Sequence, residues 1–163
     1  MSKTIVVGIS DLQVAEYPDI LVTYALGSCV GICLYDPARR IAGLAHIMLP
    51  SSSLANASNP KDKYKYADTA IPLMLERMLS KGANRSSLRA KIAGGAKMFA
   101  AINNSSIANI GQRNVEAVKS MLQNLNIPIV AEDTGKDYGR TVYLYTETGV
   151  MRVKSVNRGE FDW

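Results

Sequence analysis

Short runs of β-branched and apolar residues, bounded by glycine, proline, aspartate or serine, dominate the first third of the chain. Runs of about four to eight such residues between turn formers are typical of β-strands. We therefore predict strands over residues 4–9, 20–24, 30–35 and 41–48. The same pattern predicts later strands over 88–93, 127–131, 141–145 and 150–156, the last two forming a hairpin around Glu147-Thr148-Gly149.

Two segments instead repeat apolar residues at spacings of three and four, which is typical of amphipathic helices. The first contains Ala67, Ala70, Ile71, Met74, Leu75, Met78 and Leu79. Gly82 suits the position just after its C-terminus, and Pro72 is tolerable near its first turns. The second contains Val115, Val118, Met121, Leu122 and Leu125, with Asn109 as a candidate N-cap.

Residues 51–65 are polar and rich in turn formers, which indicates a mobile surface loop. Because short turns join the early strands, much of the sheet structure should be antiparallel. The elements together predict a layered α/β sandwich with largely antiparallel or mixed sheets and two main helices. With 163 residues and neither an internal repeat nor a linker, we expect a single domain over residues 1–163.

Composition narrows the class of protein. Apolar residues make up 47% of the chain, which is ordinary for a globular protein, and the longest apolar runs are too short for a membrane helix. The N-terminal segment meets polar residues too early for a signal peptide, so we expect a cytoplasmic protein. The net charge is +5, but the basic residues are scattered, which argues against nucleic-acid binding and allows a preference for acidic protein partners.

The chain has two cysteines, Cys29 and Cys33, and one histidine, His46. These are too few for a structural zinc site, and a disulfide is not expected in a reducing cytoplasm. Asp36-Pro37 is typical of the start of a type I turn. If a hairpin loop of even length is centred on Pro37-Ala38, Cys29 lies directly opposite His46, and an odd length would shift this register.

That pairing would give the chain a reactive thiol. A free thiol is mostly protonated at neutral pH, and a neighbouring imidazole can take its proton and hold the thiolate as an ion pair. Gly27 and Ser28 would let a substrate approach closely, and nearby N–H groups could stabilise an oxyanion. The alternative is that Cys29 is a small buried apolar side chain and His46 is structural, the role we also expect for Cys33.

At these residues the sequence resembles CheD, the chemoreceptor glutamine deamidase family of bacterial and archaeal chemotaxis. The resemblance extends in order along nearly the whole chain and is carried by Leu-Gly-Ser-Cys (26–29), Ala-His-Ile-Met-Leu-Pro (45–50), Lys-Tyr-Ala-Asp-Thr-Ala (65–70), Lys-Ile-Ala-Gly-Gly-Ala-Lys-Met-Phe (91–99), Asn-Ile-Gly-Gln-Arg-Asn (109–114), Glu-Asp-Thr-Gly (132–135) and Gly-Arg (139–140). Lys136 departs from the family, which commonly has a second glycine there; this bears on loop shape and substrate choice.

The resemblance implies a Cys–His–Thr triad made of Cys29, His46 and Thr23, acting through a thioester and without metal or cofactor. It also implies a fold related to the catalytic domain of cytotoxic necrotising factor toxins. Family members deamidate glutamines on the cytoplasmic helices of chemoreceptors, and some are credited with receptor methylesterase activity.

The resemblance further implies binding to a CheC-type phosphatase, with Phe99 where the family places a partner-contacting aromatic residue. As a sequence feature alone, Phe99 fits a core position better than a contact position. Two other functions remain open: a non-catalytic regulator that binds and stimulates a CheC-type phosphatase, and a general cysteine peptidase. A peptidase needs a cleft for an extended backbone, whereas a side-chain amide reaches a narrow pocket.

Overall fold

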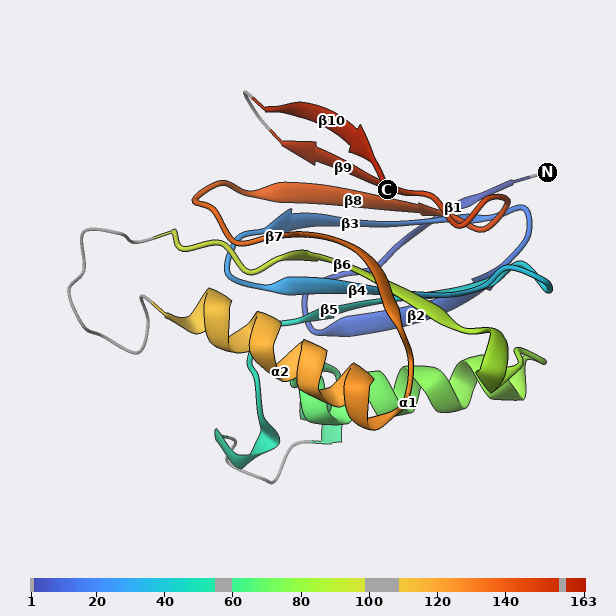
Figure 1. Ribbon diagram of the computed structural model, residues 1–163, viewed down its shortest axis with the longest axis horizontal. Helices are drawn as coiled ribbons and strands as arrows, with labels where there is room; N and C mark the ends of the chain where they lie inside the picture. Colours follow the sequence, from blue (N-terminus) through green and yellow to red (C-terminus); the bar gives the residue numbers. More distant parts are fainter. Residues whose placement is uncertain (1, 55–59, 99–108, 156–157) are drawn as a thin grey trace.

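The computed structural model describes residues 2–54, 60–98, 109–155 and 158–163. Two five-stranded sheets lie face to face, and two helices cover the outer face of one sheet (Figure 1). The β3 sheet has the order β1-β3-β8-β9-β10: Thr4–Val6, Ile20–Leu26, Arg140–Tyr145, Met151–Ser155 and Gly159–Asp162. The β4 sheet has the order β2-β5-β4-β6-β7: Asp11–Glu16, Ile41–Ile47, Val30–Asp36, Arg89–Gly94 and Ile129–Thr134.

This arrangement confirms the predicted α/β sandwich. Both sheets are mixed, because β1 pairs with β3 and β6 with β7 in parallel, while the other neighbours are antiparallel. The hairpin of β8 and β9 is also confirmed. Each predicted strand corresponds to one in the structure, although position 156 lies outside the described residues.

Two strands were not predicted, β2 and β10. Strand β2 lies at an edge and buries only Leu12 and Ala15 fully, a spacing of three that does not match the alternation of a half-buried strand. Strand β10 is exposed along its whole length and carries no apolar pattern. Edge strands of this kind are held by backbone pairing, which leaves little trace in the hydrophobic pattern.

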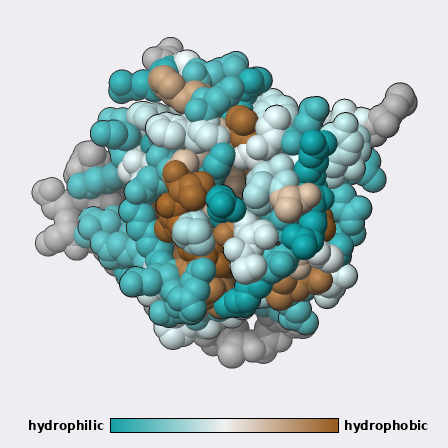
Figure 2. Space-filling view, turned by 45° about the vertical axis from the view of Figure 1, so that its right-hand side comes forward, coloured by the Kyte–Doolittle hydropathy of each residue, from teal (hydrophilic) through white to brown (hydrophobic). Residues whose placement is uncertain are grey.

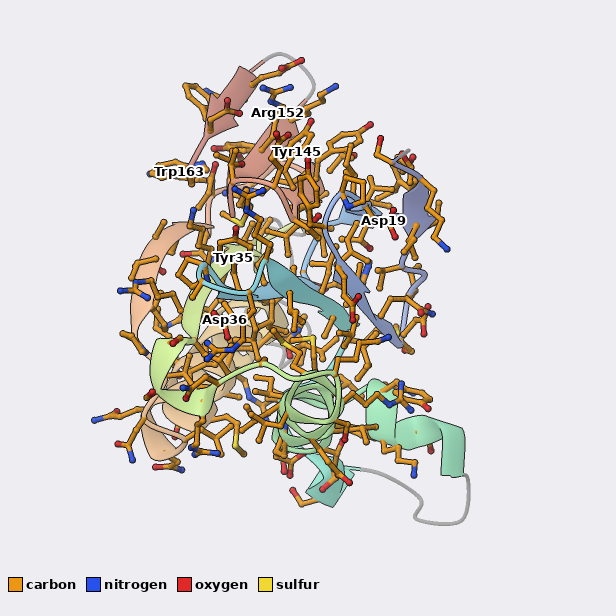
Figure 3. All side chains as sticks on the ribbon, turned by 90° about the vertical axis from the view of Figure 1, so that its right-hand side faces the viewer. Asp19, Tyr35, Asp36, Tyr145, Arg152 and Trp163 are labelled. Carbon is orange, nitrogen blue, oxygen red and sulfur yellow. The ribbon has the colours of Figure 1, made fainter. Side chains whose placement is uncertain are left out.

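Central strands β4 and β5 are buried on both faces. Alternate residues of β4, among them Cys33 and Tyr35, pack between the two sheets, while Val30, Ile32 and Leu34 pack against the helices. Successive side chains of a strand point to opposite faces, so one apolar run supplies both cores. At the end of β4, the Tyr35 hydroxyl donates to the carbonyl oxygen of Thr146 at 3.0 Å and joins the sheets (Figure 3).

Helix α1 (Ala67–Ser80) confirms the first predicted helix, with Pro72 inside it and Leu79 at its exposed side. Gly82 has φ +107°, and the Ala83 N–H donates to the Met78 carbonyl oxygen at 3.0 Å, which closes the C-terminus as expected. The described helices include none that is long and apolar enough to cross a bilayer.

Helix α2 (Ile110–Asn124) confirms the second predicted helix. Asn109 occupies the N-cap position, but its side chain makes no capping hydrogen bond, so that prediction was wrong in its chemistry. The predicted loop over 51–65 contains two short 3₁₀ helices, Ser52–Leu54 and Pro60–Tyr64, and residues 55–59 lie outside the described part. On the face in Figure 2, hydrophobic residues gather in limited areas surrounded by hydrophilic ones.

Candidate functional site

The three residues of the expected triad lie where the two sheets meet. Thr23 lies on β3, His46 lies on β5, and Cys29 lies in the bend that joins β3 to β4. Thr23 and His46 are fully buried, whereas Cys29 is partly exposed. Thr23 and His46 are therefore shielded from water, whereas Cys29 keeps part of its surface exposed.

The hairpin between β4 and β5 corrects the register that we predicted. Asp36 pairs with Ile41, so the loop is Pro37–Arg40 and His46 lies opposite Gly31, not Cys29. A two-residue loop needs positive φ at its first position, which proline cannot adopt, so the turn that begins at Asp36 requires a longer loop. Arg40, with φ +54°, closes this loop.

The shift by two residues keeps Cys29 and His46 on the same face, because side chains alternate with a period of two. Continued by one residue beyond β4, the register places Cys29 beside Met48 and therefore diagonal to His46. Diagonal neighbours on one face have Cα atoms ~7–8 Å apart and remain within reach of long side chains. The even length of the loop was thus confirmed, whereas its centre was wrong.

The residue opposite His46 is Gly31, and its lack of a side chain leaves space for Thr23, the third member of the expected triad. A Cβ atom built on Gly31 would lie 3.1 Å from Cδ1 of Leu26 and 3.7 Å from Cγ2 of Thr23. Two β3 side chains therefore occupy the space that a side chain at position 31 would need. Strand β3 also has a register irregularity between Thr23 and Leu26, with Ala25 at φ +60°. Such bulges commonly re-aim a side chain next to a functional site.

Hydrogen bonds around Thr23 fix the tautomer of His46. The Thr23 hydroxyl oxygen lies 2.7 Å from the carbonyl oxygen of Val7 and 2.7 Å from Nδ1 of His46. A carbonyl can only accept, so the single hydroxyl proton goes to Val7 and Nδ1–H of His46 donates to Thr23. Nε2 of His46 then carries a lone pair, and it is buried without a hydrogen-bond partner among the described residues.

Burial shapes the protonation states of both groups. It raises the pKa of the Cys29 thiol, against a smaller opposite effect of its own backbone N–H. It lowers the pKa of His46 to about 4. Both shifts favour the uncharged form. The free protein therefore favours a neutral thiol beside a neutral imidazole over the thiolate–imidazolium pair that we had considered.

Each carbonyl oxygen of the nucleophile segment, Gly27-Ser28-Cys29, accepts a hydrogen bond. The Gly27 oxygen accepts from the Ala96 N–H at 2.9 Å, and the Cys29 oxygen accepts from the Gly95 N–H at 2.8 Å. The Ser28 oxygen accepts from Nδ2 of Asn114 at 2.9 Å. Within the described part of the chain, the N–H groups of Ser28 and Cys29 have no acceptor, which leaves two donors beside the thiol.

A buried arginine, Arg140, binds the backbone that packs against this segment. Arg140 forms an ion pair with Asp133 at 3.1 Å and donates to the carbonyl oxygens of Gly94 and Gly135. Gly94 has φ +112°, and a Cβ atom there would collide with the Cys29 carbonyl oxygen. The sequence predicted no role for Asp133 or Arg140, although both lie in segments that carry the family resemblance. The available signal for a buried ion pair was an arginine at the start of the apolar run 141–145, with an aspartate seven positions earlier.

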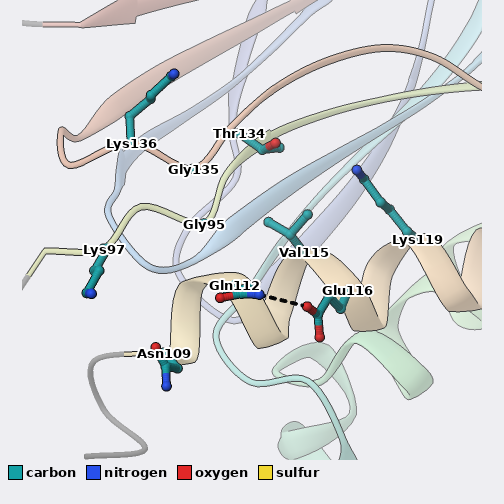
Figure 4. A pocket seen from close by; sticks show the side chains of 10 residues that line it. All are labelled: Gly95, Lys97, Asn109, Gln112, Val115, Glu116, Lys119, Thr134, Gly135 and Lys136. Carbon is teal, nitrogen blue, oxygen red and sulfur yellow. Dashed lines mark hydrogen bonds between the residues drawn. The ribbon is translucent and has the colours of Figure 1, made fainter. Parts of the chain in front are cut away.

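A groove of about 450 Å³ lies beside helix α2, and none of Cys29, His46 and Thr23 is part of its lining (Figure 4). Its walls are helix α2 and the ends of β6 and β7, and Gly95, which binds the Cys29 carbonyl, is part of its lining. Lys97 and Lys136 lie at one end and Lys119 at the other (Figure 4). Lys119 pairs with Glu132 at 2.9 Å, while Lys97 and Lys136 are exposed.

Other sequence predictions have simpler outcomes. Cys33 is free and 1% exposed in the core between the sheets, and burial raises its pKa to about 12, against the opposing charge of Lys91. This agrees with a structural role. Phe99 lies outside the described residues. Within the described part, no group of three or more His, Cys, Asp or Glu side chains could hold a metal ion.

Comparison with known proteins places the chain in one family. Residues 48–155 match the family model described as CheD chemotactic sensory transduction. The chain is 52% identical over 158 residues to the "Probable chemoreceptor glutamine deamidase CheD" of Caldanaerobacter subterraneus subsp. tengcongensis, covering 97% of this chain and 96% of that protein. It is 48% identical over 160 residues to the "Chemoreceptor glutamine deamidase CheD" of Halalkalibacterium halodurans, covering 98% of each.

Among solved structures, the fold is similar to the crystal structure of the Bacillus licheniformis hypothetical protein YfiH. The TM-score is 0.50 at 17% identity, over 76% of this chain and 50% of that one. This likeness concerns the fold alone, and the relation to the necrotising factor domain stays a prediction. The family model and the near-full-length relatives together show that this chain belongs to the CheD family.

Proposed function

We propose that this protein is a cysteine-dependent deamidase that hydrolyses glutamine side chains on the cytoplasmic helices of chemoreceptors. One observation carries the proposal: Thr23 binds Nδ1 of His46 between the sheets and leaves a buried Nε2 without a partner among the described residues, beside the core against which Cys29 also packs. The names of the relatives supply the substrate class. The proposed reaction takes place in the cytoplasm, and its steps require neither metal nor organic cofactor.

In the first step, Nε2 of His46 takes the thiol proton as the sulfur attacks the side-chain carbonyl carbon of glutamine. The resting pair is neutral, so His46 acts as a general base during attack. Thr23 accepts from Nδ1–H throughout and keeps the imidazole in the reactive tautomer. The negative charge moves to the carbonyl oxygen of the tetrahedral intermediate.

Backbone N–H groups of Ser28 and Cys29 are the proposed donors to this oxyanion. Their lack of acceptors among the described residues, beside carbonyl groups that are all bound, supports this assignment. Preorganised donors of this kind stabilise charge that develops only in the transition state. Collapse of the intermediate breaks the C–N bond, His46 gives its proton to the leaving ammonia, and a thioester remains on Cys29.

Hydrolysis of the thioester completes the cycle. His46, again neutral, takes a proton from water, whose oxygen attacks the thioester carbonyl. The C–S bond breaks, the thiolate recovers the proton from His46, and glutamate is released. A receptor methyl ester presents the same carbonyl with methanol as leaving group, so methylesterase activity uses the same residues.

The groove beside helix α2 is the proposed seat of the substrate residues that flank the glutamine. Lys97 and Lys136 are exposed at its end and give it a positive rim. Charge complementarity raises association rates and favours partners of opposite sign. We therefore propose that acidic segments of receptor helices are preferred.

The test is intact-mass analysis of a receptor cytoplasmic fragment after incubation, together with ammonia release. The wild-type protein should change each site by the mass difference between an amide and an acid. Cys29→Ala and His46→Ala should abolish this change, while the matched variant Cys33→Ala should keep it. Turnover retained by His46→Ala would overturn the proposed base.

The alternative is a non-catalytic regulator that binds and stimulates a CheC-type phosphatase. The residue that the family resemblance assigns to that contact, Phe99, lies outside the described residues. Phosphatase stimulation that survives Cys29→Ala, with no mass change by the wild-type protein, would favour the regulator. Both roles can share one surface, since a partner helix can occupy the seat of a receptor helix.

A further inference from the structure

Asn114 connects helix α2 to the two segments that carry the proposed nucleophile and base. Its side chain is fully buried, and Nδ2 lies 2.9 Å from the carbonyl oxygen of Ser28 and 2.9 Å from that of Met48. Both contacts are to acceptors, so the amide orientation is determined: the NH₂ group faces them and Oδ1 points elsewhere. Ser28 immediately precedes Cys29, and Met48 follows His46 by two residues.

The bond to Ser28 fixes the plane of one peptide. In a planar trans peptide, the C=O and the following N–H point in opposite directions. Since Nδ2 holds the Ser28 carbonyl toward α2, the N–H of Cys29 must point away from α2. The neighbouring carbonyls of Gly27 and Cys29 are held by backbone donors, so Asn114 is the only side chain among the described residues that orients this segment through its carbonyls.

Stability alone is a poor explanation for an amide at this position. Oδ1 of Asn114 is buried and has no partner among the described residues. A buried polar atom without a hydrogen bond costs stability, and such atoms are rare in folded proteins. The unpartnered Oδ1 of Asn114 therefore lowers the stability of the fold. The two N–H groups of the same side chain bind the segments that carry Cys29 and His46.

We propose that Asn114 is a positioning residue that holds the Ser28–Cys29 peptide so that the Cys29 N–H donates to the substrate oxyanion. Through Met48, the same side chain fixes the spacing between the nucleophile segment and the end of β5 that carries His46. This inference rests on the proposed deamidase function and names the residue that orders its oxyanion site.

Two variants at this position separate positioning from packing. Asn114→Asp keeps the shape of the side chain but removes both donors, and Asn114→Leu removes the polar group altogether. Val118→Ala is the control, because Val118 is buried one turn later on α2 and makes none of these hydrogen bonds. Each variant is assayed for kcat and KM on a receptor fragment and for the rate of Cys29 alkylation by iodoacetamide.

Alkylation attacks a saturated carbon and builds no oxyanion on a carbonyl, so it reports on the thiol alone. Both Asn114 variants should lower kcat by about 100-fold, as a small misplacement of a catalytic group can. Their KM and alkylation rates should stay within about threefold of wild type, and Val118→Ala should change neither rate.

The outcomes distinguish the two proposals. A wild-type protein without turnover on the fragment overturns the deamidase function and this inference with it. A wild-type protein that turns over, with Asn114 variants of equal kcat, overturns the inference alone. A parallel fall in kcat and in alkylation, or an Asn114→Leu variant that is active when Asn114→Asp does not fold, also overturns the positioning role.

Discussion

The hydroxyl oxygen of Thr23 lies 2.7 Å from Nδ1 of His46, and this contact joins the two sheets inside the core. The same hydroxyl donates to the carbonyl oxygen of Val7, which follows β1. The orientation of the proposed base is therefore set by a strand of the other sheet. Neither residue is close to the other in sequence, so the relationship depends on how the sheets pack.

Removal of this hydroxyl should impair catalysis more than folding. Thr23→Val keeps the shape but leaves Nδ1–H without its acceptor, so both tautomers become accessible. We expect kcat for ammonia release to fall by roughly 10- to 100-fold, which is up to the lower limit of the effect of general acid–base catalysis, because the base is misoriented and not removed. Thr23→Ser retains the hydroxyl and should remain near wild type. Equal activities of the two variants would contradict the orienting role.

The Cys29 thiol should be protonated in the free protein at neutral pH. Burial raises its pKa and lowers that of His46 to about 4, so neither group gains from a proton transfer at rest. Ultraviolet absorbance of the thiolate, measured from pH 5 to 8 with Cys29→Ala as the blank, should show no thiolate near pH 7. A thiolate signal at pH 7 that is absent from the blank would establish the ion pair instead.

Acid should destabilise the fold through His46. In the unfolded chain its pKa is near 6.5, whereas in the folded protein it is about 4. Between these values the unfolded state binds one more proton, so the free energy of unfolding decreases as pH falls, by about 1.4 kcal/mol per pH unit.

Other groups titrate in the same range, so the measured quantity is the difference from His46→Gln. Denaturant unfolding at several pH values should give a slope that is smaller in the variant by this amount between pH 6 and about 4.5. Identical slopes would mean that His46 is charged in the folded protein.

Two strand glycines offer a matched test of the space around the site. A Cβ atom at Gly31 would press on Cδ1 of Leu26 at 3.1 Å and lie in ordinary contact with Thr23 at 3.7 Å, between the sheets. A Cβ atom at Gly43, on the other face of the β4 sheet, would meet Met74 at 2.9 Å. Both alanine variants should lose about 1–3 kcal/mol of stability through overpacking. Only Gly31→Ala should also lower kcat, because position 31 lies opposite His46 and its methyl group would push on Leu26, on the strand that carries Thr23. A similar loss of kcat in both variants would refute a local effect.

Charge reversal in the groove should weaken substrate binding. The double variant Lys97→Glu and Lys136→Glu should raise KM severalfold at low salt with little change in kcat, and the effect should shrink as salt screens the charges. The double variant Lys3→Glu and Lys81→Glu, at exposed positions outside the groove, is the control for net charge. An equal rise in KM for the control would show that the groove is not the seat of the substrate.

Predictions from sequence succeeded where the pattern of residues is local. Apolar periodicity located both helices and the central strands, because β4 and β5 are buried on both faces and read as continuous apolar runs. Edge strands β2 and β10 were missed, since their pairing uses the backbone. The turn at Asp36 was recognised, but its loop length was not. The loop closes at Arg40, which has a positive φ, and arginine is not a residue type that indicates this conformation in a sequence.

For the site, the order of residues along the chain identified the available chemistry: one histidine, one cysteine after Gly-Ser, and an even hairpin loop that puts both on one face. The packing of the sheets and helices sets which nitrogen of His46 is free, which carbonyls Asn114 holds, and that Arg140 binds the backbone of Gly94 beside Cys29. These are contacts between different layers and between residues far apart in the chain. Their geometry follows from the packing of sheets and helix, and no spacing along the sequence encodes it.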